Sequence, residues 1–226
     1  ILRTNDGGDT WIPQGGNTYR NLTSVFFTDA NTGTAVGDSG TIVRTTNGGA
    51  AWTLQNSGIN ANFTSVCFTT TNAGVAVGTA LDSGGLILRT TNGGATWLAQ
   101  YPVAPGAVFQ SVSFGDLNTG TVAIGSGGVL RTSDAGVTWT RKYIPGNNYG
   151  VNAVSFTGAN NGTVITNRTS PDPNYPTNEK IYRTTDGGAT WKVQDSATTA
   201  GLTAVSFFDS INGAAVGIYG VILHTS

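Results

Sequence analysis

The sequence predicts an all-β protein, a β-propeller built from four-stranded antiparallel blades. Its five tryptophans, at positions 11, 52, 97, 139 and 191, are 41, 45, 42 and 52 residues apart. A period near 40 residues is typical of propeller blades. The composition agrees, because 33 of the 226 residues are glycine, methionine is absent and glutamate occurs once. Such a chain favours short strands and tight turns over helices.

Each repeat unit predicts four short strands. The first contains a Val-x-Phe alternation, as at Val25 and Phe27, and this period of two marks one buried face. A turn that closes on glycine follows, for example residues 29–33, and leads into a second strand at 34–37. A glycine-rich hairpin then precedes the third strand at 41–44. The fourth strand begins at the tryptophan.

Each tryptophan closes a near-identical phrase: RTNDGGDTW, RTTNGGAAW, RTTNGGATW, RTSDAGVTW and RTTDGGATW. The phrase resembles the Asp-box, or bacterial neuraminidase repeat. The fuller unit GTILRTTNGGATW is most similar to the photosystem II assembly and stability factor-like repeats, which also occur in secreted bacterial proteins. The resemblance covers the whole chain and implies a propeller fold.

The residues of the phrase predict a structural role. A short side-chain oxygen at the fourth position of the phrase can accept backbone N–H groups in an Asx-turn, and a glycine two residues later suits a left-handed backbone. Because aspartate and asparagine alternate there, a catalytic carboxylate or a metal ligand is excluded. These structural residues are Asp6 with Trp11, Asn47 with Trp52, Asn92 with Trp97, Asp134 with Trp139, and Asp186 with Trp191.

One basic residue opens each phrase, and two interpretations remain open for this set. Each arginine can pair with a neighbouring aromatic ring or turn carbonyl. Alternatively, the set can contact an acidic partner, since partner binding in the photosystem assembly factors is thought to use a basic surface. The residues are Arg3, Arg44, Arg89, Arg131 and Arg183, with His224 in the incomplete sixth copy.

The strand count predicts five blades in a single domain over residues 1–226. The chain starts and stops within a unit, giving 2 + 16 + 3 = 21 strands, one more than five blades need. We therefore expect the N-terminal fourth strand to complete the C-terminal blade, with residues 1–4 displaced. A segment of a longer array, or strands exchanged between molecules, remains the alternative. The expected units are 20–56, 62–101, 109–143, 151–195, and 201–226 completed by 1–14.

Residues that break the repeat are the better functional candidates. Two units carry insertions, 79–84 and 167–180, in the hairpin between their second and third strands. Alternation along the chain places this hairpin on the same face as the connections between blades. Tyrosines gather there, and tyrosine is favoured at recognition surfaces. The candidate ligand-binding residues are Tyr19, Arg20, Asp82, Tyr101, Tyr143, Asn147, Asn148, Tyr149, Asp172, Tyr175 and Tyr219.

Catalysis is not expected. Sialidases, which also carry Asp-boxes, use an arginine triad, a tyrosine assisted by glutamate, and an aspartate. Here the sole glutamate, Glu179, lies in an insertion. Xyloglucan-cleaving relatives place paired aspartates in a cleft between two larger propellers. With one histidine and one cysteine, the chain lacks a nucleophilic triad or a zinc site, and no metal or other cofactor is expected.

We therefore expect a non-catalytic recognition or assembly module that binds a glycan or a protein segment on the tyrosine-rich face. The alternative is an architectural propeller, a spacer or subunit of a surface assembly or filament, with self-association by strand exchange; a glycoside hydrolase is less favoured. The net charge of −1 and the absence of long apolar stretches predict neither nucleic-acid binding nor membrane insertion. Low charge, the abundance of threonine, asparagine and glycine, and the absence of an initial methionine favour an exported bacterial protein, extracellular or at the cell surface, cut from a longer chain.

Overall fold

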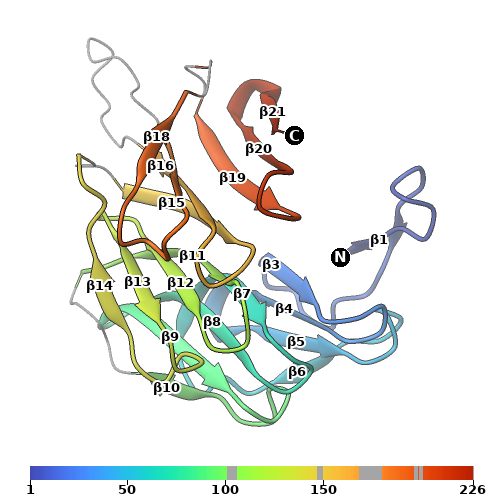
Figure 1. Ribbon diagram of the computed structural model, residues 1–226. Coiled ribbons are helices and arrows are strands. Elements are labelled where there is room, and N and C mark those ends of the chain that lie inside the picture. The colour runs from blue at the N-terminus through green and yellow to red at the C-terminus, as the bar shows by residue number, and fades with distance from the viewer. Residues whose placement is uncertain (101–105, 147–149, 168–179, 196–197, 199–200, 226) are drawn as a thin grey trace. The chain divides into compact units, whose positions relative to one another are not determined.

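The fold is an all-β five-bladed propeller of antiparallel sheets (Figure 1). The computed structural model describes the chain except residues 101–105, 147–149, 168–179, 196–197, 199–200 and 226. Its contacts divide the chain into two compact units, Ile1–Pro105 and Gly106–Ser226, and each is described by itself. The predicted fold class is confirmed.

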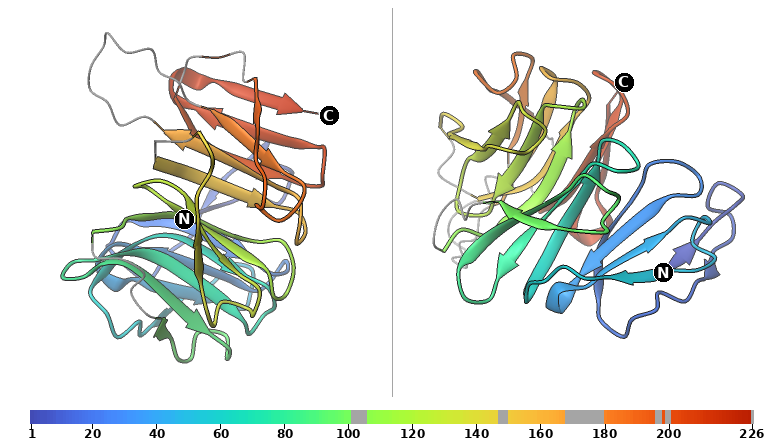
Figure 2. Two further views of the ribbon diagram at one scale, coloured as in Figure 1. Left: turned by 60° about the vertical axis from the view of Figure 1, so that its left-hand side comes forward. Right: turned by 90° about the horizontal axis from the view of Figure 1, so that it is seen from below.

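The first unit holds a small N-terminal sheet and two four-stranded sheets (Figure 2). In the small sheet, β1 (Leu2–Arg3) pairs with β2 (Ile12–Pro13). The next sheet contains β3 (Leu22–Phe27), β4 (Gly33–Gly37), β5 (Ile42–Thr45) and β6 (Thr53–Gln55), with a 3-10 turn at Asp38–Gly40. The third contains β7 (Ala61–Phe68), β8 (Gly74–Ala80), β9 (Gly84–Thr90) and β10 (Leu98–Gln100).

The second unit holds two four-stranded sheets and one with three strands. The first contains β11 (Phe109–Phe114), β12 (Gly120–Ile124), β13 (Val129–Thr132) and β14 (Thr140–Lys142). The second contains β15 (Gly150–Phe156), β16 (Gly162–Asn167), β17 (Ile181–Thr184) and β18 (Lys192–Gln194). The last contains β19 (Leu202–Phe207), β20 (Gly213–Gly217) and β21 (Ile222–Thr225), with a 3-10 turn at Ile218–Gly220.

Every complete blade contains the same aromatic pair. The phenylalanine that ends the first strand meets the Asp-box tryptophan edge to face, with ring centroids 6.0 Å apart for Phe68 and Trp97 and 6.4 Å apart for Phe156 and Trp191. The glycine that the sequence places at the end of a turn is the first residue of the second strand, directly against that phenylalanine ring. A side chain there would displace the ring.

Four arginines of the Asp-box phrases, Arg3, Arg44, Arg131 and Arg183, contact the following blade. In the second unit, the Arg131 guanidinium lies 4.5 Å from the centroid of the Phe156 ring and donates a hydrogen bond of 2.9 Å to the carbonyl of Ala159. Arg44 does the same to Phe68 and the Thr71 carbonyl in the first unit. The interpretation that pairs these arginines with rings and turn carbonyls is confirmed.

Two further features of the blades were not predicted. Each pairing of a first with a second strand contains a register shift, for example between Leu22 and Ser24. Serines on the first strand also accept hydrogen bonds from the next blade, since Ser113 Oγ accepts from the backbone N–H of Phe156 at 3.0 Å and Ser155 Oγ from that of Phe207 at 3.0 Å.

The predicted terminal closure is wrong in one respect: β2 pairs with β1, and the sheet of β19–β21 has three strands. Residues 1–4 are therefore not displaced. A hairpin closed by a short local loop costs less chain entropy than pairing two segments at opposite ends of the sequence. The hairpin is also fixed by a hydrogen bond of 2.8 Å from the Gln14 N–H to the Ile1 carbonyl.

Candidate functional site: a groove beside a free strand edge

A groove of about 430 Å³ lies in the second unit, between the sheets of β15–β18 and β19–β21. One wall comes from β16, β17 and the end of β18, and the other from β19, β20 and β21. The residues that line it are Thr163, Ile181, Arg183, Gln194, Asp195, Val205, Phe207, Gly213, Ala214, Ala215, Ile222, Leu223, His224 and Thr225. The groove thus combines apolar side chains with Arg183, His224 and Asp195.

The outer edge of β21 has no strand beside it within the described residues (Figure 1). Strand β20 pairs with β21 in the same register in which β4 pairs with β5, because Val216 faces Ile222 as Val36 faces Ile42. In the complete blade, the next strand then places Gln55 opposite Ile42. Among the described residues, the β21 edge therefore has the register that pairs with a fourth strand in a complete blade.

The backbone geometry of β21 determines which of its N–H and C=O groups point away from β20. The Val221 carbonyl accepts a hydrogen bond of 3.0 Å from the Gly217 N–H, so Val221 points its backbone groups toward β20. Since these groups alternate along a strand, Ile222 and His224 direct their N–H and C=O outward. The side chain of Ile222 is 74% exposed. Unpaired strand edges with exposed apolar side chains are templates for another strand.

Tyr219 lies in the 3-10 turn that leads into β21 and is 93% exposed. Its φ of 59° is in the left-handed region. The N–H of Ile218 donates a hydrogen bond of 2.8 Å to the Gly201 carbonyl, which joins this hairpin to the connection that precedes β19. The expected placement of second hairpins beside inter-blade connections therefore holds in this blade.

The other tyrosine-face candidates are distributed over both units. Tyr143 follows β14, is 71% exposed and has the Arg141 guanidinium 5.1 Å from its ring centroid. In the first unit, Tyr19 and Arg20 are exposed before β3, and Asp82 is exposed at the tip of the β8–β9 hairpin. The insertion at 79–84 lengthens β8 and β9 rather than forming a loop, since Ala80 pairs with Gly84.

Six candidates lie outside the described residues, and so does most of the 167–180 insertion. They are Tyr101, Asn147, Asn148, Tyr149, Asp172 and Tyr175. The described residues therefore do not show whether the eleven candidates form one site. The groove beside β21 was not predicted from the sequence.

The Asp-box carboxylates are occupied by turn hydrogen bonds. Asp134 accepts from the Thr138 hydroxyl at 2.6 Å, from the Thr138 N–H at 2.9 Å and from the Thr132 hydroxyl at 2.7 Å. These bonds lower the pKa of Asp134 to about 2. Asn47 and Asn92 occupy the same turn and accept the equivalent backbone bond. The turn needs an oxygen acceptor, not a carboxylate.

We expect the three charged Asp-boxes to make the protein sensitive to acid. Threonine hydroxyl and backbone donors lower the pKa values of Asp6, Asp134 and Asp186 from 3.8 to about 2. Because the folded pKa lies below the unfolded one, this stabilisation is present above pH 4 and is lost as the pH falls toward 2. Urea unfolding at pH 7, 4 and 2 should show a smaller acid loss in an Asp6→Asn/Asp134→Asn/Asp186→Asn variant than in the wild type. An equal loss of stability in the variant and the wild type would contradict the role of these three carboxylates in acid sensitivity. Asp82→Asn, which changes an aspartate outside the Asp-boxes, is the control.

The described part of the chain has no group of three or more histidine, cysteine, aspartate or glutamate residues that could hold a metal. Cys67, the one cysteine of the sequence, is buried. The described residues also contain no apolar helix of membrane-spanning length.

A family model described as photosynthesis system II assembly factor YCF48 matches residues 9–142 and 49–205, which together cover most of the sequence. The chain belongs to the YCF48 family. The resemblance read from the Asp-box phrase is thereby confirmed. No curated protein matches the chain.

Solved structures similar to this YCF48-family chain share its fold. A structure titled "YCF48 from Cyanidioschyzon merolae" matches with a TM-score of 0.72 and 21% identity, over 99% of this chain and 76% of that one. "YCF48 bound to D1 peptide" matches with a TM-score of 0.66 and 18% identity over 92% of this chain, which spans 63% of that protein's length. A GH74 enzyme of Niastella koreensis matches with a TM-score of 0.68 and 20% identity, over 86% of this chain and 34% of the enzyme.

Proposed function

We propose that this protein is a non-catalytic protein-binding module that captures an extended polypeptide segment along the outer edge of β21. The observation that carries the proposal is the open groove along β21, whose walls combine apolar side chains with Arg183. Membership of the YCF48 family supports it, since a YCF48 structure has been solved with a bound D1 peptide.

Capture would proceed by β-strand addition. An antiparallel segment exchanges backbone hydrogen bonds with the outward N–H and C=O groups of Ile222 and His224. Backbone pairing provides affinity without a sequence requirement. Alternate side chains of the segment then enter the groove and provide selectivity.

The groove walls favour a segment with apolar residues and an acidic residue. Val205, Phe207 and Leu223 offer apolar surface, and burying it favours binding by about 25 cal/mol per Å². Arg183 already donates to the Ser210 carbonyl and lies 5.9 Å from the centroid of the Phe207 ring, so its charge is held in place at the groove. Tyr219, at the start of β21, would contact the far end of an antiparallel segment.

The tyrosine face is the second candidate, and the exposure of Tyr19, Tyr143 and Tyr219 favours it. Aromatic rings with polar tips suit sugars as well as peptides. We propose a glycan as the alternative ligand of that face.

Low charge and abundant threonine, asparagine and glycine support an exported, cell-surface protein, which fractionation of the source cells would test.

Peptide binding with and without an intact β21 edge tests the proposal. We expect His224→Pro to weaken binding of extended, alternating apolar peptides about tenfold or more, because it removes an outward N–H and leaves the pairing with β20 intact. His224→Ala is the matched control, since it also loses the imidazole but keeps the backbone N–H, and it should bind more tightly than His224→Pro. Binding is measured by biolayer interferometry, and circular dichroism checks that each variant is folded.

Equal binding by His224→Pro and His224→Ala would overturn the strand-edge proposal. Binding of glycans on an array that is lost in Tyr143→Ala and Tyr219→Ala, but kept in His224→Pro, would favour the glycan alternative.

A further inference from the structure

Two of the Asp-box turns carry asparagine followed by glycine, and both lie in complete blades of the first unit. They are Asn47-Gly48 and Asn92-Gly93. Asparagine before glycine is the pair most prone to spontaneous deamidation, because glycine has no Cβ atom to hinder the approach of its backbone nitrogen to the side-chain carbonyl. The two turns therefore contain chemistry that the Asp-boxes with aspartate do not share.

The reaction needs no reagent other than water. The backbone nitrogen of Gly48 bonds to the side-chain carbonyl carbon of Asn47, and the bond from that carbon to the amide nitrogen breaks. The proton of the Gly48 N–H leaves with the amide nitrogen as ammonia, and a succinimide ring remains. One water molecule then opens the ring at either of its two carbonyl carbons, which gives aspartate or isoaspartate.

Two further Asn-Gly pairs are less prone to this reaction. They are Asn161-Gly162 and Asn212-Gly213, and in both the glycine begins the second strand of a blade. Each of these glycines is paired with a strand on either side. Its nitrogen can approach the asparagine only if a central strand moves, whereas the Asp-box glycines belong to a turn.

The attacking nitrogens of the two Asp-box sites are restrained in the same way. The Gly48 N–H donates a hydrogen bond of 2.8 Å to the Asn31 carbonyl, and the Gly93 N–H donates one of 2.9 Å to the Asn72 carbonyl. Both glycines are buried. At either site, the turn must therefore open locally before the nitrogen can attack.

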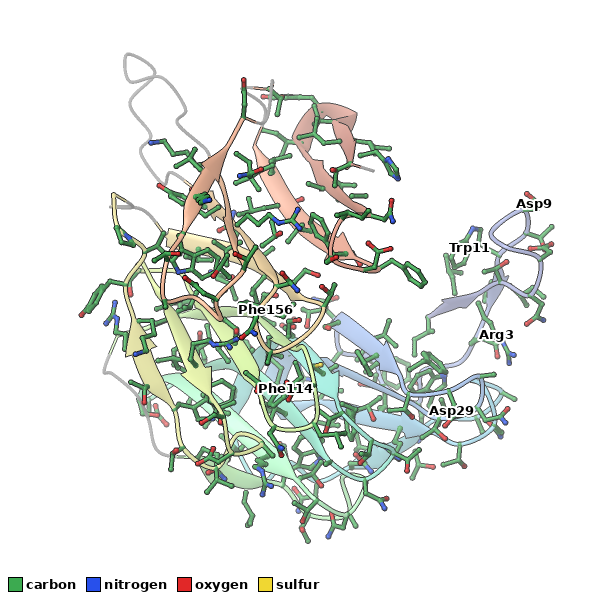
Figure 3. All side chains as sticks on the ribbon, in the orientation of Figure 1. Arg3, Asp9, Trp11, Asp29, Phe114 and Phe156 are labelled. Atoms are coloured by element: carbon green, nitrogen blue, oxygen red, sulfur yellow. The ribbon has the colours of Figure 1, made fainter. Side chains whose placement is uncertain are left out.

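The carbonyls that accept these bonds are also fixed in both blades. Asn31 lies in the turn between β3 and β4, where Asp29 accepts its N–H at 2.8 Å (Figure 3). In the next blade, the Thr70 hydroxyl accepts the N–H of Asn72 at 3.2 Å. A difference in reactivity must therefore come from the asparagine side chains.

The two side chains share the contacts of their oxygen atoms. Each Oδ1 accepts from the hydroxyl of the threonine two residues earlier and from the backbone N–H four residues later, at 2.9 or 3.0 Å. Both side chains are exposed to solvent. The oxygen contacts therefore protect Asn47 and Asn92 equally.

The amide nitrogens differ. Nδ2 of Asn92 donates a hydrogen bond of 2.9 Å to the Thr96 hydroxyl, so that this carboxamide is held at both of its polar atoms. At Asn47 the equivalent residue is Ala51, which has no hydroxyl. Within this turn, all of which the structure describes, the amide nitrogen of Asn47 has no acceptor. Its carboxamide can rotate toward the glycine nitrogen at a smaller cost.

We propose that Asn47 is a site of spontaneous deamidation, and that the Thr96 hydroxyl protects Asn92 from the same reaction. The net contribution of one hydrogen bond corresponds to a rate difference of about fivefold. The inference goes beyond the proposed function, because this turn lies in the first unit and the β21 edge in the second.

The two products have different effects on the blade. Aspartate keeps the turn, because Asp134 accepts the equivalent hydrogen bonds with a carboxylate. Isoaspartate lengthens the backbone by one carbon atom, so that the Gly49 N–H cannot keep its bond of 2.9 Å to the Thr45 hydroxyl. The turn leads directly into Trp52, which is 4% exposed. We therefore expect isoaspartate to loosen the packing of this tryptophan.

Mass spectrometry of folded protein aged at mildly alkaline pH tests the inference. Trypsin cleaves after Arg44 and Arg89, so Asn47 lies in the peptide 45–89 and Asn92 in the peptide 90–131. Replacement of NH2 by OH raises the peptide mass, and fragmentation assigns the change to a residue. We expect Asn47 to convert about fivefold faster than Asn92.

Two exchanges between the turns are the matched variants. Ala51→Thr supplies the missing hydroxyl and should slow conversion of Asn47 to the rate of Asn92. Thr96→Ala removes the hydroxyl and should raise the rate at Asn92 to that of Asn47. In concentrated urea both sites should convert at the same rate, since each lies in the sequence Thr-Thr-Asn-Gly-Gly-Ala.

Equal rates at the two sites in the folded protein would overturn the inference, and so would a rate at Asn47 that Ala51→Thr leaves unchanged. A difference that persists in urea would also overturn it, because the difference would then not come from the fold. In urea unfolding, Asn47→Asp should match the wild type. The deamidated fraction of aged protein, collected by ion exchange, should unfold at a lower urea concentration. Coincident curves for these two samples would contradict the expected effect of isoaspartate.

Discussion

Replacing Trp97 with alanine is expected to lower the free energy of unfolding by about 3–5 kcal/mol. Trp97 is 8% exposed and belongs to a core with Phe63, Phe68 and Leu88. Its ring meets Phe68 edge to face, with an interplanar angle of 88°. Truncation removes a large buried apolar surface and leaves a cavity that strands fixed by their ladders cannot collapse to fill.

Urea denaturation followed by circular dichroism measures this loss. Trp11→Ala is the matched control, because it removes the same side chain from the same motif at a position that is 57% exposed. At a protein concentration low enough to keep the chain monomeric, the control should cost less than about 1 kcal/mol. Similar losses in both variants would mean that the tryptophan acts through the Asp-box turn rather than through burial.

Replacing Gly78 with alanine is expected to destabilise the protein by about 1–3 kcal/mol. A Cβ atom at this position would lie 2.2 Å from the carbonyl oxygen of Asn62 and 2.6 Å from the Cα of Phe63. Both are backbone atoms, so no side-chain rotation relieves the clash. The glycine is required because β8 passes directly over the start of β7, where the register of the pair shifts.

Gly15→Ala is the control for this prediction, because nothing lies within 4 Å of a Cβ there. It should change stability by no more than about 0.5 kcal/mol. Differential scanning calorimetry of both variants and the wild type checks the result. If the two glycines tolerate alanine equally, the close backbone approach is not a stabilising feature of the fold.

Much of the blade could be predicted from the sequence because the same local pattern occurs five times. The Val-x-Phe alternation fixes which face of the first strand is buried. The Asp-box fixes its turn through short-range hydrogen bonds, and the left-handed glycines of the phrase, such as Gly49 with a φ of 89°, were expected from their position. Arginine pairing with rings and turn carbonyls was one of two interpretations, and the structure decided it.

Other features needed coordinates because they depend on distant residues. The register shift before Ser24 leaves no mark in the Val-x-Phe pattern. The glycine before each second strand was assigned to a turn, whereas Gly162 lies against the Phe156 ring. The groove beside β21 arises from two neighbouring sheets, and no stretch of sequence encodes it.

The sequence by itself determined the all-β class, the four strands of a blade, the Asp-box turns and the family, because these depend on periodicity and on hydrogen bonds between residues a few positions apart. Only the tertiary structure decided which strand β2 accompanies and which two sheets line the groove beside β21. Residues 1–4 and 222–225 are near copies, so the local pattern suits either one as partner of β2. The choice depends on the entropy of closing the chain and on packing between elements, which a local pattern does not contain.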